Sequence, residues 1–241
     1  MTSTIRVLAS LIVLSAAACQ RATPPAPAPT VAAPSPHAAA AELSAQVDRY
    51  WESYLALNPS IASAAGDRRF DAHLENSVSL QYLADSLDLE RAALSALAGV
   101  NAGALDGKSR LDYEIFKLGR EQAVSGYLYP QELLPVNQLE GMPQRVARMA
   151  AGDGGHAFTD THGYEAWIAR IDDYSAWTDQ AIANLREGAR RGYLLPQAVV
   201  ERLLPPLALW SQGGGDASFL RPLQHFPKNV NAADQARLTT A

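Results

Sequence analysis

The sequence predicts an all-α fold, a multi-helix array or bundle that follows a signal peptide and a disordered Pro/Ala-rich tether. Three observations support this prediction. Apolar residues recur at three- and four-residue steps over much of the chain after residue 42, as on one face of a helix. Helix-starting and helix-ending residues separate these apolar stretches. Strand signals are thin, because neither sustained apolar–polar alternation nor an Asn-Gly hairpin occurs.

The composition allows a folded core and argues against a nucleic-acid partner. Of the 241 residues, 48% are hydrophobic, which is enough for one or two domains. The formal net charge is −5, and the densest basic group, formed by Arg186, Arg190 and Arg191, is interpreted as a solvated helix end. Because nucleic-acid binders usually carry a basic patch, we expect no nucleic-acid partner.

Residues 1–18 have the pattern of a secretory signal peptide. A charged residue, Arg6, precedes an apolar run that is too short to span a bilayer, because a spanning helix needs about 20 apolar residues. Small residues at Ala16, Ala17 and Ala18 complete the pattern. We therefore expect secretion across the inner membrane.

Cys19, the only cysteine, directly follows this segment and resembles the acylated cysteine of a bacterial lipobox. The resemblance implies a lipid anchor in a membrane, and Gln20 in place of Asp implies an outer-membrane lipoprotein that faces the periplasm. The position three residues before the cysteine, usually Leu, is Ala16. Ordinary cleavage after Ala18 is therefore the alternative, and it would give a soluble periplasmic protein.

Residues 19–41 are predicted to form the lipidated cysteine and an extended linker. Six prolines occur between residues 24 and 36. Repeated proline prevents a helix and favours an extended chain of about 3.1 Å per residue. Such a linker would hold the helical domain, predicted for residues 42–241, well away from a membrane.

Capping and breaking residues define the helices expected in this domain. Asparagine followed by proline ends a helix, and glycine after an apolar periodic stretch does the same. Serine and threonine cap helix starts, and proline suits the first helical turn. The expected boundaries, in order, are Glu42 to Asn58, Ser60 to Gly66, Ser77 to Gly99, Ser109 onward, Thr161 to Gly192, Pro196 to Pro205-Pro206, and Asn231 to Ala241.

Two of these segments carry specific expectations. Leu111, Ile115 and Leu118 are spaced for burial on the helix that begins at Ser109. Pro205-Pro206 must end or kink its helix, because proline removes a backbone hydrogen bond and clashes with the preceding turn.

Large aromatic residues and one pair of carboxylates have structural interpretations. Adjacent helical residues point about 100° apart, so Asp172 and Asp173 cannot share one proton. We expect one of them to be exposed and the other to pair with a residue such as Arg170. The aromatic residues expected in the core, with ligand stacking as the alternative, are Trp51, Tyr54, Trp167 and Trp177.

No complete motif for catalysis is found. The phosphate-binding patterns GxGxxG and GxxxxGK[ST], the GxSxG elbow and the HExxH zinc helix are all missing from the sequence. The best local cluster of metal-ligand types is Asp153, His156, Asp160 and His162, beside a Gly-rich stretch. Its spacing matches no established zinc pattern, so it is interpreted as a polar surface loop, with a metal site as the alternative. We expect no cofactor, no metal ligand and no catalytic residue in this chain.

Several stretches together resemble a bacterial family, DUF885. They keep the family's order from Tyr50 to the end of the chain, with a departure at Pro205-Pro206. The matching stretches are Tyr50–Pro59, Gly66–Asp71, Leu134–Gly141, Gln180–Gly188 and Val199–Arg202, with Gly192, Pro196 and Phe226-Pro227.

The resemblance implies a helical zinc metallopeptidase of the HExxH type. In longer relatives an HExxPGH-like zinc helix lies in the later half, and the present chain stops before it. The chain is therefore expected to be truncated at its C-terminus and to correspond to the N-terminal half only. No zinc ligand or catalytic Glu is carried over to it, and zinc is expected only in full-length relatives.

Three functions follow as hypotheses. The first is an envelope lipoprotein that resembles the non-catalytic half of a zinc-dependent peptidase and is inactive alone. The second is a non-enzymatic periplasmic binding or scaffold module, and the third an unrelated helical enzyme that uses the Asp153–His162 cluster. Peptides are a candidate partner, and Asn137, Gln138 and Arg186 are candidates for lining a cleft, with structural hydrogen bonding as the alternative. A half-domain should also expose apolar surface.

Overall fold

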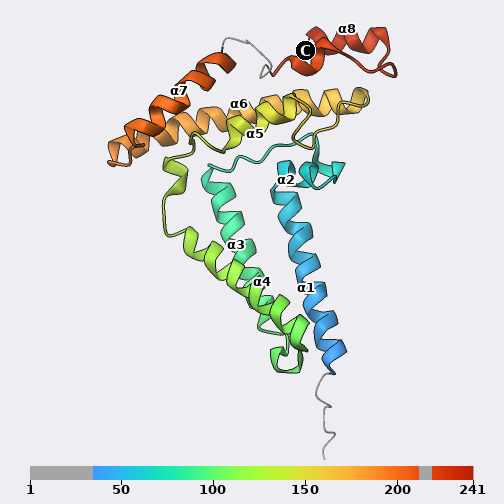
Figure 1. Ribbon diagram of the computed structural model, residues 1–241, viewed down its shortest axis with the longest axis vertical. Helices are drawn as coiled ribbons and strands as arrows, with labels where there is room; N and C mark the ends of the chain where they lie inside the picture. The colour runs from blue at the N-terminus through green and yellow to red at the C-terminus, as the bar shows by residue number, and fades with distance from the viewer. Residues whose placement is uncertain (1–34, 212–218, 241) are drawn as a thin grey trace, which may run out of the picture. The chain divides into compact units, whose positions relative to one another are not determined.

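The computed structural model describes residues 35–211 and 219–240. This part of the chain contains eight α-helices and four short 3-10 turns and no strand, so the predicted all-α fold is confirmed (Figure 1). The signal peptide, Cys19 and the linker as far as residue 34 lie outside the described residues. None of the described helices combines the length and the apolar character that a membrane crossing requires.

The first helix, α1 (Pro36–Leu57), begins six residues before the predicted start at Glu42. Pro36 occupies the first turn, where its missing N–H costs no hydrogen bond. Ser35 caps the helix, because its Oγ accepts from Ala38 N at 3.3 Å. The end of the predicted linker is therefore helical. The predicted stop at Asn58 is confirmed, and α2 (Pro59–Ala64) follows directly.

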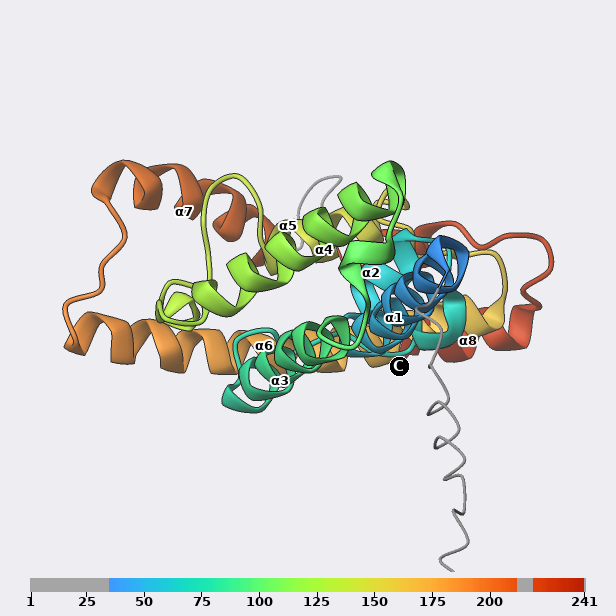
Figure 2. The same cartoon turned by 90° about the horizontal axis from the view of Figure 1, so that it is seen from below.

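Helices α3 (Leu80–Leu97) and α4 (Gly107–Gly126) pack on α1 and on each other (Figures 1 and 2). Ser79 caps α3 in place of the predicted Ser77, and Asp106 caps α4 just before the predicted start at Ser109. A small core joins the three helices. Its buried members are Leu43, Leu97 and Val100, and half-buried Val47, Leu105, Tyr113 and Phe116 pack against them.

The prediction that Leu111, Ile115 and Leu118 are buried is wrong. Their exposed fractions are 59%, 61% and 54%. Tyr113 and Phe116 face α1 and α3 instead. Both faces of α4 carry apolar residues at helical spacing, so the period alone could not identify the inner face.

The longest helix, α6 (Thr161–Arg190), carries the main core together with α5 (Met142–Ala150). Trp167 and Trp177 are each only 2% exposed, which confirms their predicted core position, whereas Trp51 is 44% exposed. Gly192 ends α6 as predicted, with φ +85°. The buried members of this core are Leu74, Val78, Met142, Val146, Met149, Ala150, Trp167, Trp177 and Ala181.

The last two helices are α7 (Gln197–Ser211) and α8 (Ala232–Thr240). The helix α7 continues through Pro205 and Pro206, so the prolines do not end it. The carbonyls that lose a partner belong to Glu201 and Arg202, four residues earlier, and both residues are exposed to water. Helix α8 starts after Asn231 as predicted, and its Leu238 joins Tyr164 of α6 in a small buried cluster.

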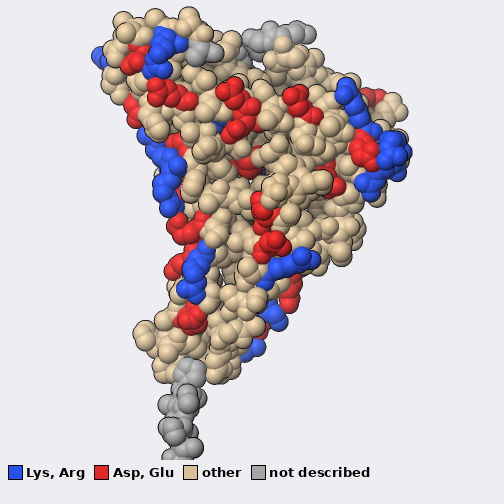
Figure 3. Space-filling model, turned by 180° about the vertical axis from the view of Figure 1, so that it is seen from behind, with Lys and Arg blue, Asp and Glu red and all other residues tan. Residues whose placement is uncertain are grey.

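Charged side chains of both signs are interspersed over the surface. On the face shown in Figure 3, Lys and Arg side chains form separate groups with Asp and Glu between them.

Candidate functional site

Arg170 of α6 is the centre of a buried polar network and is only 1% exposed. Its Nε donates to the His73 carbonyl at 2.9 Å, and Nη2 donates to Ser63 Oγ. Its charge lies 3.8 Å from a carboxylate oxygen of Asp71, whose side chain is fully buried. These bonds hold the segment from α2 to His73 against α6, so the role of Arg170 is structural.

The predicted pairing of Arg170 with Asp172 or Asp173 is therefore wrong. Asp173 Oδ2 instead accepts a hydrogen bond from the Leu74 backbone N–H at 2.9 Å. The partner of Arg170, Asp71, lies about a hundred residues away in sequence, where local spacing gives no signal.

His156 lies inside the same network and is 4% exposed. Its Nδ1 lies 3.0 Å from Arg170 Nη1, and its Nε2 lies 2.8 Å from the Gly163 carbonyl. Burial lowers the pKa of His156, the nearby Arg170 charge lowers it further, and the Gly163 carbonyl opposes this shift. The side chain is a neutral structural element of the core.

The residues Asp153, His156, Asp160 and His162 are not brought together. Asp160 caps α6 by accepting from Gly163 N at 2.9 Å, and it also contacts Arg68 at 3.5 Å. Within residues 35–211 and 219–240, no three His, Cys, Asp or Glu side chains gather as metal ligands would.

The Gly-rich stretch beside this cluster has a steric explanation. Gly155 has φ +83°, and a Cβ there would lie 2.6 Å from Ala64 Cα and from Ser63 O. The loop therefore packs directly against the backbone of α2, and only glycine allows this approach.

A second polar cluster connects α2, α5 and the loop before α3. Glu75 accepts from Ser60 N at 3.0 Å and from Arg145 Nη1 at 2.8 Å. Arg145 Nη1 also donates to Ser60 Oγ at 2.8 Å. Every member is engaged by another member, so the cluster reinforces the fold and offers no free group for chemistry.

A third polar cluster joins α1, α3 and α4, each of which supplies one residue. Glu90 Oε1 accepts from Tyr50 Oη at 3.0 Å and from Arg120 Nη1 at 3.1 Å. The Arg120 guanidinium lies over the Tyr50 ring, 4.3 Å from its centroid. Burial raises the pKa of Glu90 to about 7, so this carboxyl is poised to titrate near neutral pH.

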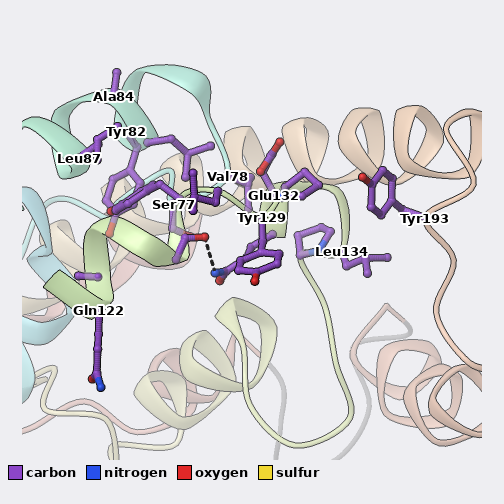
Figure 4. A pocket seen from close by; sticks show the side chains of 18 of the residues that line it. Ser77, Val78, Tyr82, Ala84, Leu87, Gln122, Tyr129, Glu132, Leu134 and Tyr193 are labelled. Atoms are coloured by element: carbon purple, nitrogen blue, oxygen red, sulfur yellow. Dashed lines mark hydrogen bonds between the residues drawn. The ribbon is translucent and has the colours of Figure 1, made fainter. Parts of the chain in front are cut away.

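One hollow in the described part of the chain is a cleft of about 1150 Å³. We call it the α3–α4 cleft; it lies between α3 and α4, beside residues 127–135 and the chain that leaves α6 (Figure 4). Figure 4 shows Tyr129 between the α3 side chains and Tyr193. The lining residues are Ser77, Val78, Tyr82, Leu83, Ala84, Leu87, Gly119, Gln122, Ala123, Gly126, Tyr127, Leu128, Tyr129, Pro130, Gln131, Glu132, Leu134, Pro135, Arg191 and Tyr193.

Four of the fifteen large exposed apolar side chains among the described residues line this cleft. Leu128, Tyr129, Leu134 and Tyr193 all line it, with exposed fractions of 81%, 70%, 36% and 40%. Because single exposed apolar residues are normal but a group around a concavity is not, this group makes the cleft the candidate binding site.

Polar groups in the cleft are mostly uncharged hydroxyls and amides. Tyr82 Oη donates to Asn58 Oδ1 at 2.7 Å, and burial raises the pKa of Tyr82 to about 12. Burial also raises the pKa of Tyr127. Both phenols therefore stay protonated at neutral pH. Among the lining residues, Glu132 and Arg191 alone carry a charge.

A second, smaller hollow of about 390 Å³ lies between α1 and α4. We call it the α1–α4 groove. Asp112 is its only charged lining residue, and Lys108 contacts Asp112 at 2.7 Å. The lining residues are Ala40, Leu43, Ser44, Val47, Ser109, Asp112, Ile115 and Phe116.

The three residues predicted to line a cleft do not line either of these two hollows. Asn137 Oδ1 accepts from the backbone N–H groups of Leu139 and Glu140, each at 2.8 Å, so Asn137 stabilises its own loop. Gln138 is half-buried and Arg186 is exposed. None of the three is among the residues that line the cleft or the groove.

Sequence reasoning missed the residues that do line the cleft. The usable signal is the run Tyr127-Leu128-Tyr129-Pro130, an aromatic and apolar stretch just beyond the end of α4. It lies between two expected helices, where large apolar residues have no core helix to join, and it is in such connecting segments that binding residues often occur.

Comparisons with known proteins identify the family. A family model described as "Bacterial protein of unknown function (DUF885)" matches residues 59–241, which is more than half of the chain. Searches of curated proteins and of solved structures return no match. The chain therefore belongs to the DUF885 family of bacterial proteins.

Proposed function

We propose that this chain is an envelope lipoprotein whose helical domain binds peptides in the α3–α4 cleft and supplies no catalytic metal of its own. The observation that carries the proposal is the group of exposed apolar residues, Leu128, Tyr129, Leu134 and Tyr193, around one concave site. Apolar pockets with a few placed polar groups are the usual form of a ligand site.

The chemistry of the lining favours a polypeptide. Leu83 and Leu87 can receive aliphatic side chains, while the amides of Gln122 and Gln131 can bond to peptide N–H and C=O groups. A neutral sugar could use the same hydroxyls and amides, so it is the competing ligand in the test below. A peptide with apolar side chains can also contact the two leucines, and it therefore satisfies the cleft best.

Binding can be tested on the purified chain with a capped, uncharged peptide that carries a fluorophore. We expect Tyr129→Ser to weaken binding about tenfold, because the lost ring removes about 1.4 kcal/mol or more of apolar burial. Leu209→Ser is the matched control, since Leu209 is 48% exposed on α7 and lines neither hollow. Equal loss in both variants, or displacement of the peptide by a neutral oligosaccharide, would count against a peptide site.

The second part of the proposal concerns catalysis. The family resemblance supports zinc-assisted peptide hydrolysis in longer relatives, in which this domain would contribute binding. Fluorogenic peptide hydrolysis by the pure chain, measured with added zinc and with a chelator, tests this. No turnover is expected, and an activity that the chelator abolishes and zinc restores would overturn it.

The envelope location is supported by the sequence of residues 1–19. Growth of an expressing bacterium with labelled palmitate should place the label on the wild-type chain and leave Cys19→Ser unlabelled. A Cys19→Ser chain that is labelled equally well would refute lipidation at this cysteine.

A further inference from the structure

One face of α4 lines both hollows. Ile115 and Phe116 belong to the α1–α4 groove, and Gly119, Gln122 and Ala123 belong to the α3–α4 cleft. Steps of three and four residues keep these positions on one side of a helix. The two hollows therefore follow one another along the same side of α4.

At Gly119, where the two hollows adjoin along α4, no other segment approaches the helix closely. A Cβ built at Gly119 would meet nothing within 4 Å. Ile115 and Leu118 border this stretch and are 61% and 54% exposed. The helical spacing predicted that these two side chains are buried. Because they are exposed instead, apolar surface is available beside both hollows.

The face also has a definite length and charge. Asp112 to Gly126 spans about 21 Å at 1.5 Å per residue. An extended peptide covers this distance with about six or seven residues, at roughly 3.3 Å each. Asp112, Glu132 and Arg191 are the only charged residues that line either hollow. The rest of the lining is uncharged, so a charged segment would lose hydration there and find few groups to pair with.

We propose that the α4 face is an extended binding track, on which an uncharged, apolar-rich polypeptide segment of about seven residues or more occupies the α3–α4 cleft and the α1–α4 groove together. This inference rests on the proposed peptide binding at the cleft. It adds that the ligand is a stretch of extended chain, and that affinity grows with its length until the groove is filled.

The test uses two capped peptides that repeat the unit Ala-Leu-Gln-Ser, one of four residues and one of twelve. The short peptide spans about 13 Å and the long one about 40 Å, so only the long one can extend over the whole length of the face, about 21 Å, and fill both hollows. We expect the twelve-residue peptide to bind the full chain at least about tenfold more tightly than the four-residue peptide.

Ile115→Lys separates the two hollows. This substitution should weaken binding of the long peptide about tenfold and leave binding of the short peptide unchanged. Tyr129→Ser, in contrast, should weaken binding of both peptides. Ile115→Leu, which keeps an apolar side chain, should restore binding of the long peptide. Leu209→Lys is the control for an added charge on an exposed apolar position.

The outcomes distinguish the two proposals. Binding of both peptides with equal affinity, unaffected by Ile115→Lys, would overturn the extended track and leave the cleft as a peptide site. Failure of both peptides to bind would overturn the cleft as well. The track would also be overturned if Leu209→Lys weakened binding of the long peptide as strongly as Ile115→Lys does, because the effect would then come from the added charge alone.

Discussion

Arg170 Nη1 lies 3.0 Å from His156 Nδ1, in a site where both side chains are buried. A guanidinium can only donate, so Nδ1 must accept and the proton of the neutral imidazole must be on Nε2. That proton points to the Gly163 carbonyl, 2.8 Å away. Protonation of His156 would place two N–H groups against each other, which explains why the site keeps the ring neutral.

This arrangement predicts a loss of stability in mild acid. The pKa of His156 is lowered in the folded chain, so its contribution is complete above the unfolded pKa of about 6.5 and is lost as the pH falls below it. His156→Gln should remove this part of the pH dependence of the urea midpoint between pH 7.5 and 5.5. His162→Gln, which makes the same replacement at an exposed histidine, is the matched control. The same slope in wild type and His156→Gln would contradict the assignment.

Removal of the Arg170 side chain should be severely destabilising. Arg170→Met keeps the volume but removes the buried cation 3.8 Å from Asp71, so that only the more exposed Arg68, 3.1 Å from Asp71, still pairs with this carboxylate. Because breaking a buried pair costs about 3–5 kcal/mol and Arg68 compensates for part of the loss, a cost of about 3 kcal/mol is expected. Arg190→Met, at an exposed pair with Glu187, should leave the unfolding free energy unchanged. Denaturation in urea measures the unfolding free energy of both variants. Equal effects of the two substitutions would show that the buried network stabilises the fold no more than an exposed ion pair does.

Two helical glycines should respond in opposite directions to alanine. A Cβ at Gly163 would lie 2.1 Å from the Ala157 carbonyl oxygen, so Gly163→Ala should destabilise by about 1–3 kcal/mol. Gly119 has open space, and Gly119→Ala should stabilise α4 by about 0.5–1 kcal/mol through helix propensity. Thermal melting of the two variants checks the sign, and a stabilised Gly163→Ala would refute the packing described at the start of α6.

Glu90 should make an opposite contribution to the pH dependence. Burial raises its pKa from 4.5 to about 7, so the stability it contributes is complete below 4.5 and is lost as the pH rises through 7. The difference in urea midpoint between wild type and Glu90→Gln should therefore change between pH 5 and 8, in favour of the variant at high pH. Glu114→Gln, on the exposed side of α4, serves as the control. A constant difference over this range would mean that contact with Arg120 holds Glu90 ionised throughout.

The exposed apolar residues of α4 should govern self-association and contribute little to folding. Replacing Leu111, Ile115 and Leu118 together by Gln should change the unfolding free energy by no more than about 0.5 kcal/mol per site, since each is more than half exposed. Binding of a hydrophobic dye and light scattering at high protein concentration should both fall. Strong destabilisation would show that these side chains belong to the core after all.

The start and stop signals of most helices were predictable because they act locally. Asn58-Pro59 and Gly192 have the effects that their backbone chemistry dictates. Helix α5 was missed, since it is only nine residues long and its N-cap residue, Gly141, provides no side-chain cap. The inner face of α4 was assigned wrongly, because two apolar faces on one helix are distinguished only by the elements that pack against it.

The candidate site was less predictable than the fold. The pairing of Arg170 with Asp71 and the cleft lined by Tyr82, Tyr129 and Tyr193 each join segments far apart in the sequence. Composition and spacing carry no information about which distant segments meet. What the sequence did contain was an unexplained apolar run at Tyr127–Pro130, and such runs between helices are worth treating as candidate binding residues.

The hydrogen bonds of Arg170 also constrain the order in which segments of the protein can fold during synthesis. His73 and Ser63 leave the ribosome about a hundred residues before the side chain that binds them. During synthesis the Asp71 carboxylate stays exposed to water until Arg170 has been made. Helices α1, α3 and α4 lie close together in sequence and can associate before then. Closure of the molecule around α6 should therefore be a late, slow step, because non-local contacts form after local ones.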